Sequence, residues 1–353
     1  MISRERVMGA IERKKIDRVP IWELFWATTL DRWHEQGLPK DADVHKHFGL
    51  DGSGGTYIDS SFQYPTSVIE DTDEYTVTVS ADNVKMKTFK KSASMFGFSE
   101  YSIVTREDWE KNKPRLAFNE SRLDTKWAKA NYDNTKDSIV QVFTQPAVGT
   151  SKFIACMGTE NLLVAIAEDP DWIKDMVETL ERLAFDALDH CMGAGMEYDL
   201  GIIQDDMGFS NGPFFSPAFY REVIFPSHKR YCDYIHSKGM KAMLHSCGDI
   251  RKLLPLIVEA GFDVLNPLEV KAGMDIYQIK KDYGDRLTLW GGINVKTISG
   301  GDLGKLRDEI KDKVTFAKQG GGYIFASDHS IPENVPLETY KKMVEWGIEY
   351  GSY

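Results

Sequence analysis

His245 and Cys247 form a His-x-Cys pair that could hold a metal ion. Residues two apart in an extended strand point to the same side, so the imidazole and the thiol can converge on one point. Both groups are good ligands for zinc. A third ligand must come from elsewhere, and the available side chains are His329, Asp328, Glu269 and Asp206. Alternatively, Cys247 is a small packed residue and His245 only forms a hydrogen bond with a substrate.

Asp205 and Asp206 form a second candidate site. A carboxylate here could hold a cation, orient a ligand or act as an acid or base. It could equally cap the following loop, which is rich in turn residues. Neighbouring residues of a strand point to opposite sides, so at most one of the two side chains faces the mouth of the predicted barrel. We take Asp206 as a candidate acid or base, and Asp205 as a candidate substrate ligand.

These residues follow runs that read as strands and alternate with amphipathic, helix-like runs such as Asp171 to Ala194 and Pro217 to Lys238. The predicted strands are Arg18 to Glu23, Ser138 to Gln145, Leu200 to Gln204, Lys241 to His245, Val264 to Asn266, Leu287 to Gly291 and Tyr323 to Ala326. This order favours a parallel sheet, and about eight such units close into a barrel. We therefore expect one α/β barrel over residues 1–353.

One segment interrupts the alternation. Residues 74–104 contain two alternating runs around Asp82-Asn83, which predicts a β-hairpin insertion, and a helix is expected over Arg106 to Trp127. The glycines of residues 52–55 and 320–322 are expected to form flexible turns. Neither group has the spacing of a phosphate-binding loop.

Polar groups recur at five consecutive predicted strand ends, where α/β barrels place their active sites. Besides the residues above, Asn266 and Asn294 occupy such positions, and Asn294 is a candidate substrate ligand. Trp22, Phe25 and Trp26 follow the first strand. Any one of these rings could belong to the core, but together they could wall an apolar pocket for an aromatic or methylated substrate.

Composition limits the partners. The net charge of −11 argues against nucleic acid or an anionic membrane surface. No apolar run approaches the roughly 20 residues of a membrane span, and the charged N-terminus lacks the apolar core of a signal peptide. We expect a cytoplasmic protein whose four cysteines are thiols.

Several segments resemble the uroporphyrinogen decarboxylase superfamily, and within it the cobalamin-dependent methyltransferases. They are DRVPIWE (17–23), GPFFSPAFYREVIFP (212–226), MLHSCGDI (243–250), LWGGINV (289–295) and SDHSIPENVPLETYKKM (327–343). The resemblance implies a single distorted (β/α)8 TIM barrel with an N-terminal extension. The decarboxylase grips its substrate's carboxylates with an arginine after the first strand, whereas this chain has Glu23 and no arginine there. Porphyrinogen decarboxylation is therefore not expected.

The methyltransferases of this superfamily bind zinc through His-x-Cys and a later cysteine. His245 and Cys247 match the first pair, and His329 stands where the later cysteine would be. The resemblance thus implies zinc on His245, Cys247 and His329, and the neighbouring strand ends offer Glu269 or Asp206 as a candidate fourth ligand. We predict transfer of a methyl group from a small methylated compound, such as an aryl methyl ether, to cobalamin carried by a separate corrinoid protein. Asp206, His245 and His329 would be the catalytic residues.

Three alternatives stay open at this point. The chain could be a decarboxylase of a smaller substrate, a methylcobalamin:thiol methyltransferase, or a binding module for a corrinoid or tetrapyrrole without activity. For its own assembly we expect a monomer or a homodimer.

Overall fold

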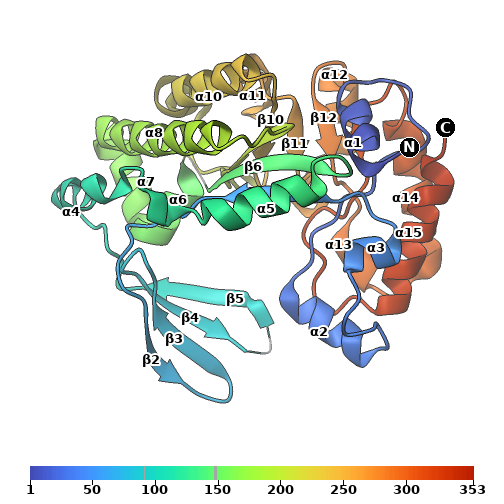
Figure 1. The fold of residues 1–353 in the computed structure, drawn as a ribbon, viewed down its shortest axis with the longest axis horizontal. Helices are drawn as coiled ribbons and strands as arrows, with labels where there is room; N and C mark the ends of the chain where they lie inside the picture. Colours follow the sequence, from blue (N-terminus) through green and yellow to red (C-terminus); the bar gives the residue numbers. More distant parts are fainter. Residues whose placement is uncertain (91, 147–148) are drawn as a thin grey trace.

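The computed structural model describes residues 1–90, 92–146 and 149–353 and is organised around a seven-stranded parallel sheet (Figure 1). Its order is β1 (Ser53–Tyr57), β6 (Val140–Pro146), β7 (Leu200–Gln204), β10 (Lys241–His245), β11 (Val264–Asn266), β12 (Thr288–Trp290) and β13 (Tyr323–Ile324). The helices that connect the strands pack on the outside of the curled sheet. This is the TIM-barrel-like fold that the alternating pattern predicted.

The first predicted strand closes the gap between β13 and β1. The Phe325 amide donates to the Pro20 carbonyl (2.8 Å) on one side, and the Asp51 amide donates to the Ile21 carbonyl (2.7 Å) on the other. This segment forms only isolated bridges rather than a regular strand. It lies in the eighth position as an irregular segment outside the seven-stranded sheet.

The residues of β7 alternate between the barrel interior and the helix layer. Leu200 and Ile202 join an interior cluster with residues of the other strands and with α1 (Ser3–Ile11). Gly201 faces α10 so closely that a Cβ there would lie 2.5 Å from an Ile235 methyl. The same alternation, continued past the strand end, directs position 206 inward and position 205 outward.

The outer layer contains helices of very different length. The remaining helices are α2 (Ala27–Glu35), α3 (Val44–Phe48), α4 (Arg106–Asn112), α5 (Thr125–Thr135), α6 (Thr150–Met157), α7 (Thr159–Glu168), α8 (Pro170–Gly193), α9 (Pro217–Phe219), α10 (Phe225–Ser237), α11 (Leu254–Ala260), α12 (Ile276–Tyr283), α13 (Val295–Ser299), α14 (Leu303–Ala317) and α15 (Leu337–Gly351). Shorter elements are 3-10 turns at Lys113–Leu116, Glu120–Arg122 and Val270–Ala272, a π-helical turn at Tyr220–Ile224, and the strands β8 (Gly208–Phe209) and β9 (Gly212–Pro213).

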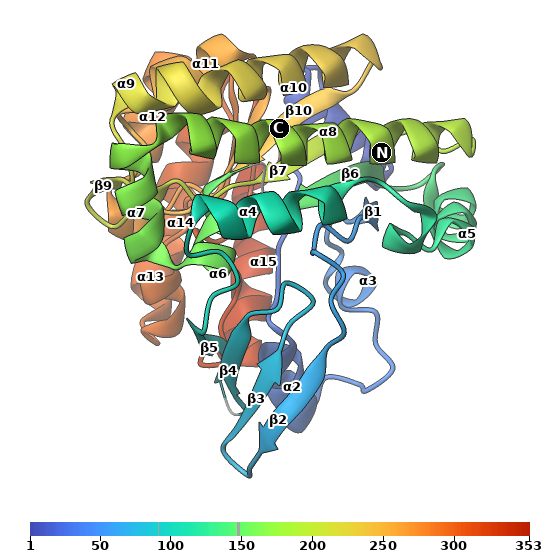
Figure 2. The ribbon, with the colours of Figure 1, turned by 90° about the vertical axis from the view of Figure 1, so that its left-hand side faces the viewer.

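The insertion is larger than the predicted hairpin. The hairpin corresponds to β3 (Tyr75–Val79) and β4 (Lys85–Phe89), but β2 (Ser67–Asp71) and β5 (Ser92–Ser99) extend it to a four-stranded antiparallel sheet. This sheet projects away from the barrel (Figures 1 and 2). All five residues of β2 are exposed, so this strand carries no alternation of apolar and polar residues that would have revealed it.

Two other predictions were wrong. The glycines near residue 53 form β1 rather than a turn, because β1 lies so close to its neighbours that a Cβ on Gly54 would come within 2.8 Å of Thr135 and Gln141. The helix expected over Arg106 to Trp127 is broken into α4, two 3-10 turns and the start of α5. Pro114 is the second residue of the first 3-10 turn, and the Asp124 carboxylate caps α5 through the Trp127 amide.

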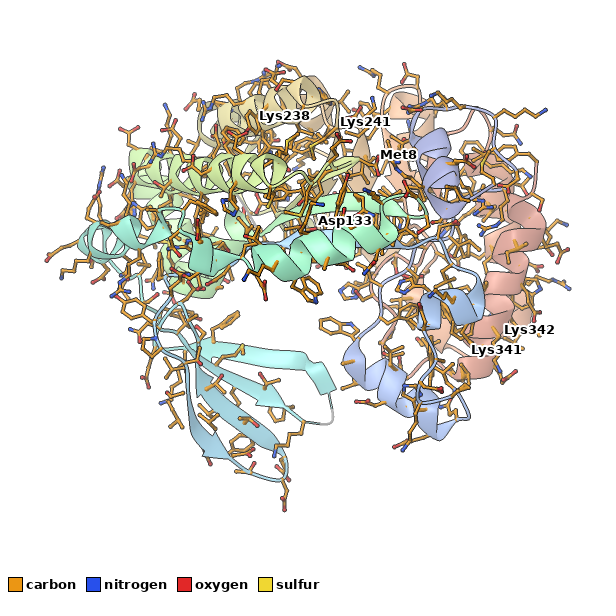
Figure 3. The ribbon with its side chains drawn as sticks, viewed as in Figure 1. Met8, Asp133, Lys238, Lys241, Lys341 and Lys342 are labelled. Atoms are coloured by element: carbon orange, nitrogen blue, oxygen red, sulfur yellow. The ribbon has the colours of Figure 1, made fainter. Side chains whose placement is uncertain are left out.

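Charged side chains cover the outer faces of the helices, as Lys341 and Lys342 on α15 and Asp133 on α5 illustrate (Figure 3). Lys341 and Lys342 pair with acidic residues of their own helix. Across the described residues, we find no helix with both the length and the apolar character needed to span a membrane.

Candidate active site

A cavity of about 440 Å³ lies at the carboxyl ends of the barrel strands. Strand-end residues that line it are Gln204, Asp206, His245, Cys247, Asn266 and Trp290. The rest of its wall comes from the segment after the first barrel strand, the start of α6 and the loop of residues 326–330. Most of the strand ends singled out in the sequence therefore open into one space.

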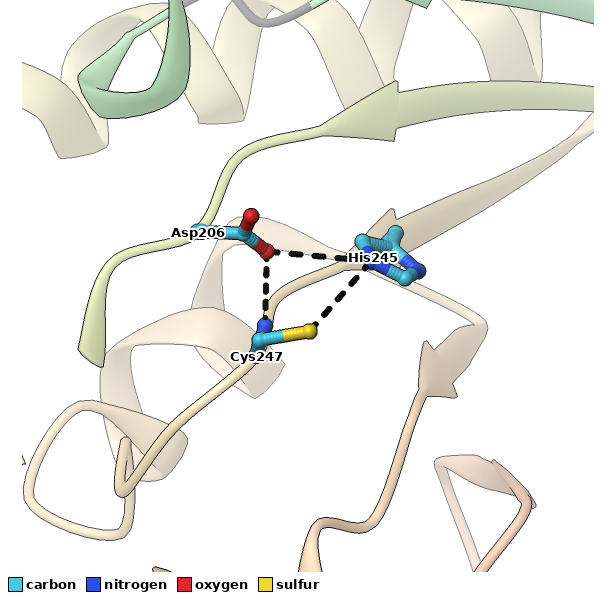
Figure 4. A group of neighbouring side chains, drawn as sticks. All are labelled: Asp206, His245 and Cys247. Atoms are coloured by element: carbon cyan, nitrogen blue, oxygen red, sulfur yellow. Dashed lines mark hydrogen bonds and ion pairs between the residues drawn. The ribbon is translucent and has the colours of Figure 1, made fainter. Parts of the chain in front are cut away.

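Asp206, His245 and Cys247 form a compact group at the ends of β7 and β10 (Figure 4). His245 Nε2 lies 3.6 Å from Cys247 Sγ and 3.7 Å from Asp206 Oδ1. The Cys247 amide donates to Asp206 Oδ1 (2.8 Å), which holds the carboxylate over the loop. All three side chains are partly buried, and candidate ligand atoms of the group lie within 4.8 Å of one another.

The second nitrogen of His245 is fixed by Asn266. Nδ1 lies 2.6 Å from the Asn266 Oδ1 atom, which is an acceptor, so Nδ1 carries the proton and donates. Nε2 then carries the free lone pair, and this atom faces Asp206 and Cys247. A histidine that binds a metal is usually held by such a hydrogen bond through its other nitrogen.

These three residues fit a zinc ion. A tetrahedral site with zinc's usual bonds has neighbouring ligand atoms about 3.3–3.8 Å apart, and both measured separations from His245 Nε2 fall in that range. Burial, reinforced by the Asp206 and Glu269 carboxylates, raises the pKa of the Cys247 thiol. A bound cation would reverse that effect by favouring the thiolate. Three protein ligands also leave a fourth position for another group, as in catalytic zinc sites.

The other predicted ligands lie outside this group. His329 lines the cavity, but it follows β13, three strands away from β10, and it is not among the side chains whose ligand atoms come together. Glu269 lies close to Cys247, but its oxygens accept from the Gly248 amide (2.6 Å) and pair with Lys271 (3.1 Å). Asp206 completes the group instead, because β7 pairs directly with β10.

Asp205 points away from the cavity, as strand alternation requires. It is fully buried, and Oδ1 accepts from the Ser151 amide (3.2 Å) at the start of α6. Oδ2 lies 3.9 Å from His228 Nε2, and neither atom has a hydrogen-bond partner among the described residues. Burial raises the pKa of Asp205 to about 7. A role in direct substrate contact, as predicted, does not fit this position.

The three predicted aromatic residues divide between cavity and core. Trp22 lines the cavity and stacks on Trp290 with ring centroids 4.2 Å apart, while the Trp290 indole donates to the Trp22 carbonyl (2.7 Å). Trp26 also lines the cavity and stacks on His329 (6.4 Å). Phe25 turns the opposite way and packs edge-on against aromatic rings, including Trp33 and Tyr340.

Glu23 forms part of the cavity wall but is almost fully buried. Its carboxyl accepts from the Ser327 amide (2.8 Å), the Ser327 hydroxyl (2.9 Å) and the Leu24 amide (3.1 Å). Burial raises the pKa of Glu23 to about 7. The neighbouring Asp328 is also buried, and its two oxygens accept from the Val270 and Val295 amides.

Some site residues differ from the sequence-based prediction. Asn294 does not line the cavity, because its side chain caps α13 by accepting from the Lys296 amide (2.9 Å). Trp290 and Ser327 were not singled out, although both lie in segments at strand ends. Asn266 was noted only for its position, and its contact with His245 depends on the register of β10 with β11.

Comparison with known proteins agrees with this architecture. The family model of uroporphyrinogen decarboxylase (URO-D) matches residues 150–350, which is more than half of the chain. A solved methyltransferase from Methanosarcina mazei superposes with a TM-score of 0.68 at 16% identity over 99% of both chains. A GH18 chitinase from Flavobacterium johnsoniae aligns over 65% of this chain and 81% of its own, at 15% identity and a TM-score of 0.35, too low to carry an argument. No curated protein sequence matches. On the strength of the family match, this chain belongs to the uroporphyrinogen decarboxylase family.

Proposed function

We propose that this protein transfers a methyl group from a small, uncharged methylated aromatic compound to the cobalt of a corrinoid carried by a separate protein. The observation that carries the proposal is the group of Asp206, His245 and Cys247 in a cavity walled by tryptophans. The methyltransferase with the same overall fold supports the reaction class. The corrinoid partner rests on the family resemblance.

The charges around the cavity favour an uncharged substrate. Among the described residues, the acidic lining side chains are Glu23 and Asp206, and the lysine in the lining, Lys152, pairs with Asp82 of the insertion. No arginine lines the cavity in the described part of the chain. A polycarboxylate would therefore lack the cationic clamps that usually bind such groups. A flat, neutral ring can instead pack against the indole rings at little cost in desolvation.

Departure of an aryl oxide from its methyl group requires that the oxygen be stabilised as negative charge develops on it. Asp206, His245 and His329 all line the cavity and could supply a proton to this oxygen, His245 only as the imidazolium, because its neutral form has no proton on Nε2. If zinc binds to Asp206, His245 and Cys247, it would supply Lewis-acid polarisation of the same oxygen. Asn266 would then keep His245 in the tautomer whose Nε2 lone pair is available to the ion.

The proposal is tested with reduced cobalamin, the protein and a panel of methoxyaromatics. Formation of methylcobalamin, followed by absorbance, is the expected result, and neutral methoxyaromatics should react faster than their carboxylated analogues. His245→Ala and Asp206→Ala should each slow the reaction without unfolding the protein. Methylation of a thiol by methylcobalamin, with no reaction of any methoxyaromatic, would indicate the reverse transfer. Release of carbon dioxide from a carboxylated substrate, with no methyl transfer, would indicate a decarboxylase.

A further inference from the structure

The Ser327 hydroxyl lies between two acceptors that cannot both receive its hydrogen. It is 2.9 Å from Glu23 Oε1, and it also contacts the carbonyl oxygen of His329. A hydroxyl has one hydrogen to donate. If it donates to Glu23, the His329 carbonyl loses this donor. If it donates to the His329 carbonyl, the contact with Glu23 is favourable only when Glu23 itself carries a proton and donates it to Ser327.

Burial favours the protonated form of Glu23 and outweighs the opposite effect of the Ser327 and Leu24 amides that donate to its carboxyl. Glu23 is 3% exposed, and no lysine, arginine or histidine of the described chain is among the charged groups that act on it. The titratable groups that face it are the Asp328 carboxyl, the Tyr323 hydroxyl and the Tyr340 hydroxyl, none of which is a cation. Moving an unpaired carboxylate into such a site is costly, whereas the neutral acid is not penalised in this way.

We propose that Glu23 is a positioning residue that works as a neutral acid, and that the chain from Glu23 through Ser327 to the His329 carbonyl holds the loop of residues 327–330 against the cavity. This loop carries His329 into the cavity, where its ring stacks on Trp26. A second connection runs alongside, since the Ile331 amide donates to the Leu24 carbonyl (2.9 Å). The proposal does not depend on methyl transfer, because it concerns the shape of the loop.

Loss of the Glu23 proton would rearrange the hydrogen bonds that run from Glu23 through Ser327 to the His329 carbonyl. An ionised Glu23 would take the Ser327 hydrogen and leave the His329 carbonyl without that donor. The folded protein therefore holds a proton that the unfolded chain releases at lower pH. Because the folded pKa is about 7 and the ordinary value is 4.5, the associated stability is complete below about pH 4.5 and is lost as the pH rises through about 7.

The test compares wild type with Glu23→Gln, which keeps the shape of the neutral acid and cannot ionise. As the pH rises from about 4.5 to about 8, the melting temperature of wild type should fall relative to Glu23→Gln by roughly 5 °C. Glu338→Gln, at an exposed glutamate of α15, should follow wild type at every pH. Parallel melting curves for wild type and Glu23→Gln over this range would overturn the proposal.

Infrared spectroscopy provides an independent readout. At about pH 6, the carbonyl-stretch band of neutral carboxylic acids, to which buried Asp205 also contributes, should be smaller in Glu23→Gln than in wild type and unchanged in Glu338→Gln. If Glu23→Ala fails to fold while Glu23→Gln folds, the glutamine has restored the hydrogen bonds from residue 23 through Ser327 to the His329 carbonyl, as expected. An identical carboxylic acid signal in wild type and Glu23→Gln would show that Glu23 is ionised and would contradict the proposal. Both readouts can succeed even if no methyl transfer is found.

Discussion

Replacing Asn266 should weaken zinc binding although this residue is not a proposed ligand. Asn266→Ala removes the oxygen that holds His245 Nδ1–H at 2.6 Å, and His245 can then rotate or change tautomer. Loss of such an outer contact typically lowers metal affinity by about 10–100-fold, or about 1.4–2.7 kcal/mol. Asn266→Asp should act in the opposite direction, because a carboxylate is the stronger acceptor.

The assay is competition for zinc against a chromophoric chelator at neutral pH. Asn294→Ala is the matched control, since it removes an asparagine that caps α13 at a neighbouring strand end. It should cost about 1 kcal/mol of stability and leave the zinc affinity unchanged. An Asn266→Ala protein that binds zinc as tightly as wild type, with the control behaving as expected, would refute the assignment of Nε2 as the metal-facing nitrogen.

Three further predictions follow from the same structure. Cys247→Ser should strongly reduce the zinc content of the purified protein, whereas Cys191→Ser should not, because Cys191 is buried in α8. Equal zinc contents in the two variants would exclude Cys247 as a ligand. Trp26→Ala should raise KM with little loss of stability. Trp22→Ala leaves a hole in a packed aromatic pair and should cost about 3–5 kcal/mol of stability in denaturant unfolding. Equal stability losses would contradict the assignment of Trp26 to the cavity wall and of Trp22 to a packed pair. Because burial raises the folded pKa of Asp205 to about 7, wild type should lose stability relative to Asp205→Asn as the pH rises from about 4 to about 7. A constant difference in melting temperature would show that folding does not raise the pKa of Asp205.

The barrel was predictable where local pattern decides the structure. The runs at Leu200–Gln204, Lys241–His245 and Val264–Asn266 are short, apolar and flanked by turn residues, and the strands observed there have the predicted limits. Strand β1 could not be found in this way, because its glycines are explained only by close contact with residues far along the chain. Strand β2 is missing from the prediction because it has no buried face.

The candidate site was only partly predictable for a related reason. His245 and Cys247 converge because strand geometry repeats every two residues, and this needs no knowledge of the fold. The choice of Asp206 over His329 depends on which strands are neighbours, and the sequence does not state that order. The opposite orientations of Phe25 and Trp26 likewise arise from packing around the start of α2, where Phe25 meets Trp33 and Tyr340.

The most direct test of the proposed function is the initial rate of methylcobalamin formation from reduced cobalamin and one neutral methoxyaromatic, measured with protein as purified, stripped of metal and reloaded with zinc. We predict a measurable rate for the first, a rate near background for the second and full recovery for the third, with no recovery in Cys247→Ser. Equal rates in all three preparations would contradict the role assigned to the Asp206, His245 and Cys247 group. No methylcobalamin from any neutral methoxyaromatic, in zinc-loaded and folded protein, would contradict the proposed function itself.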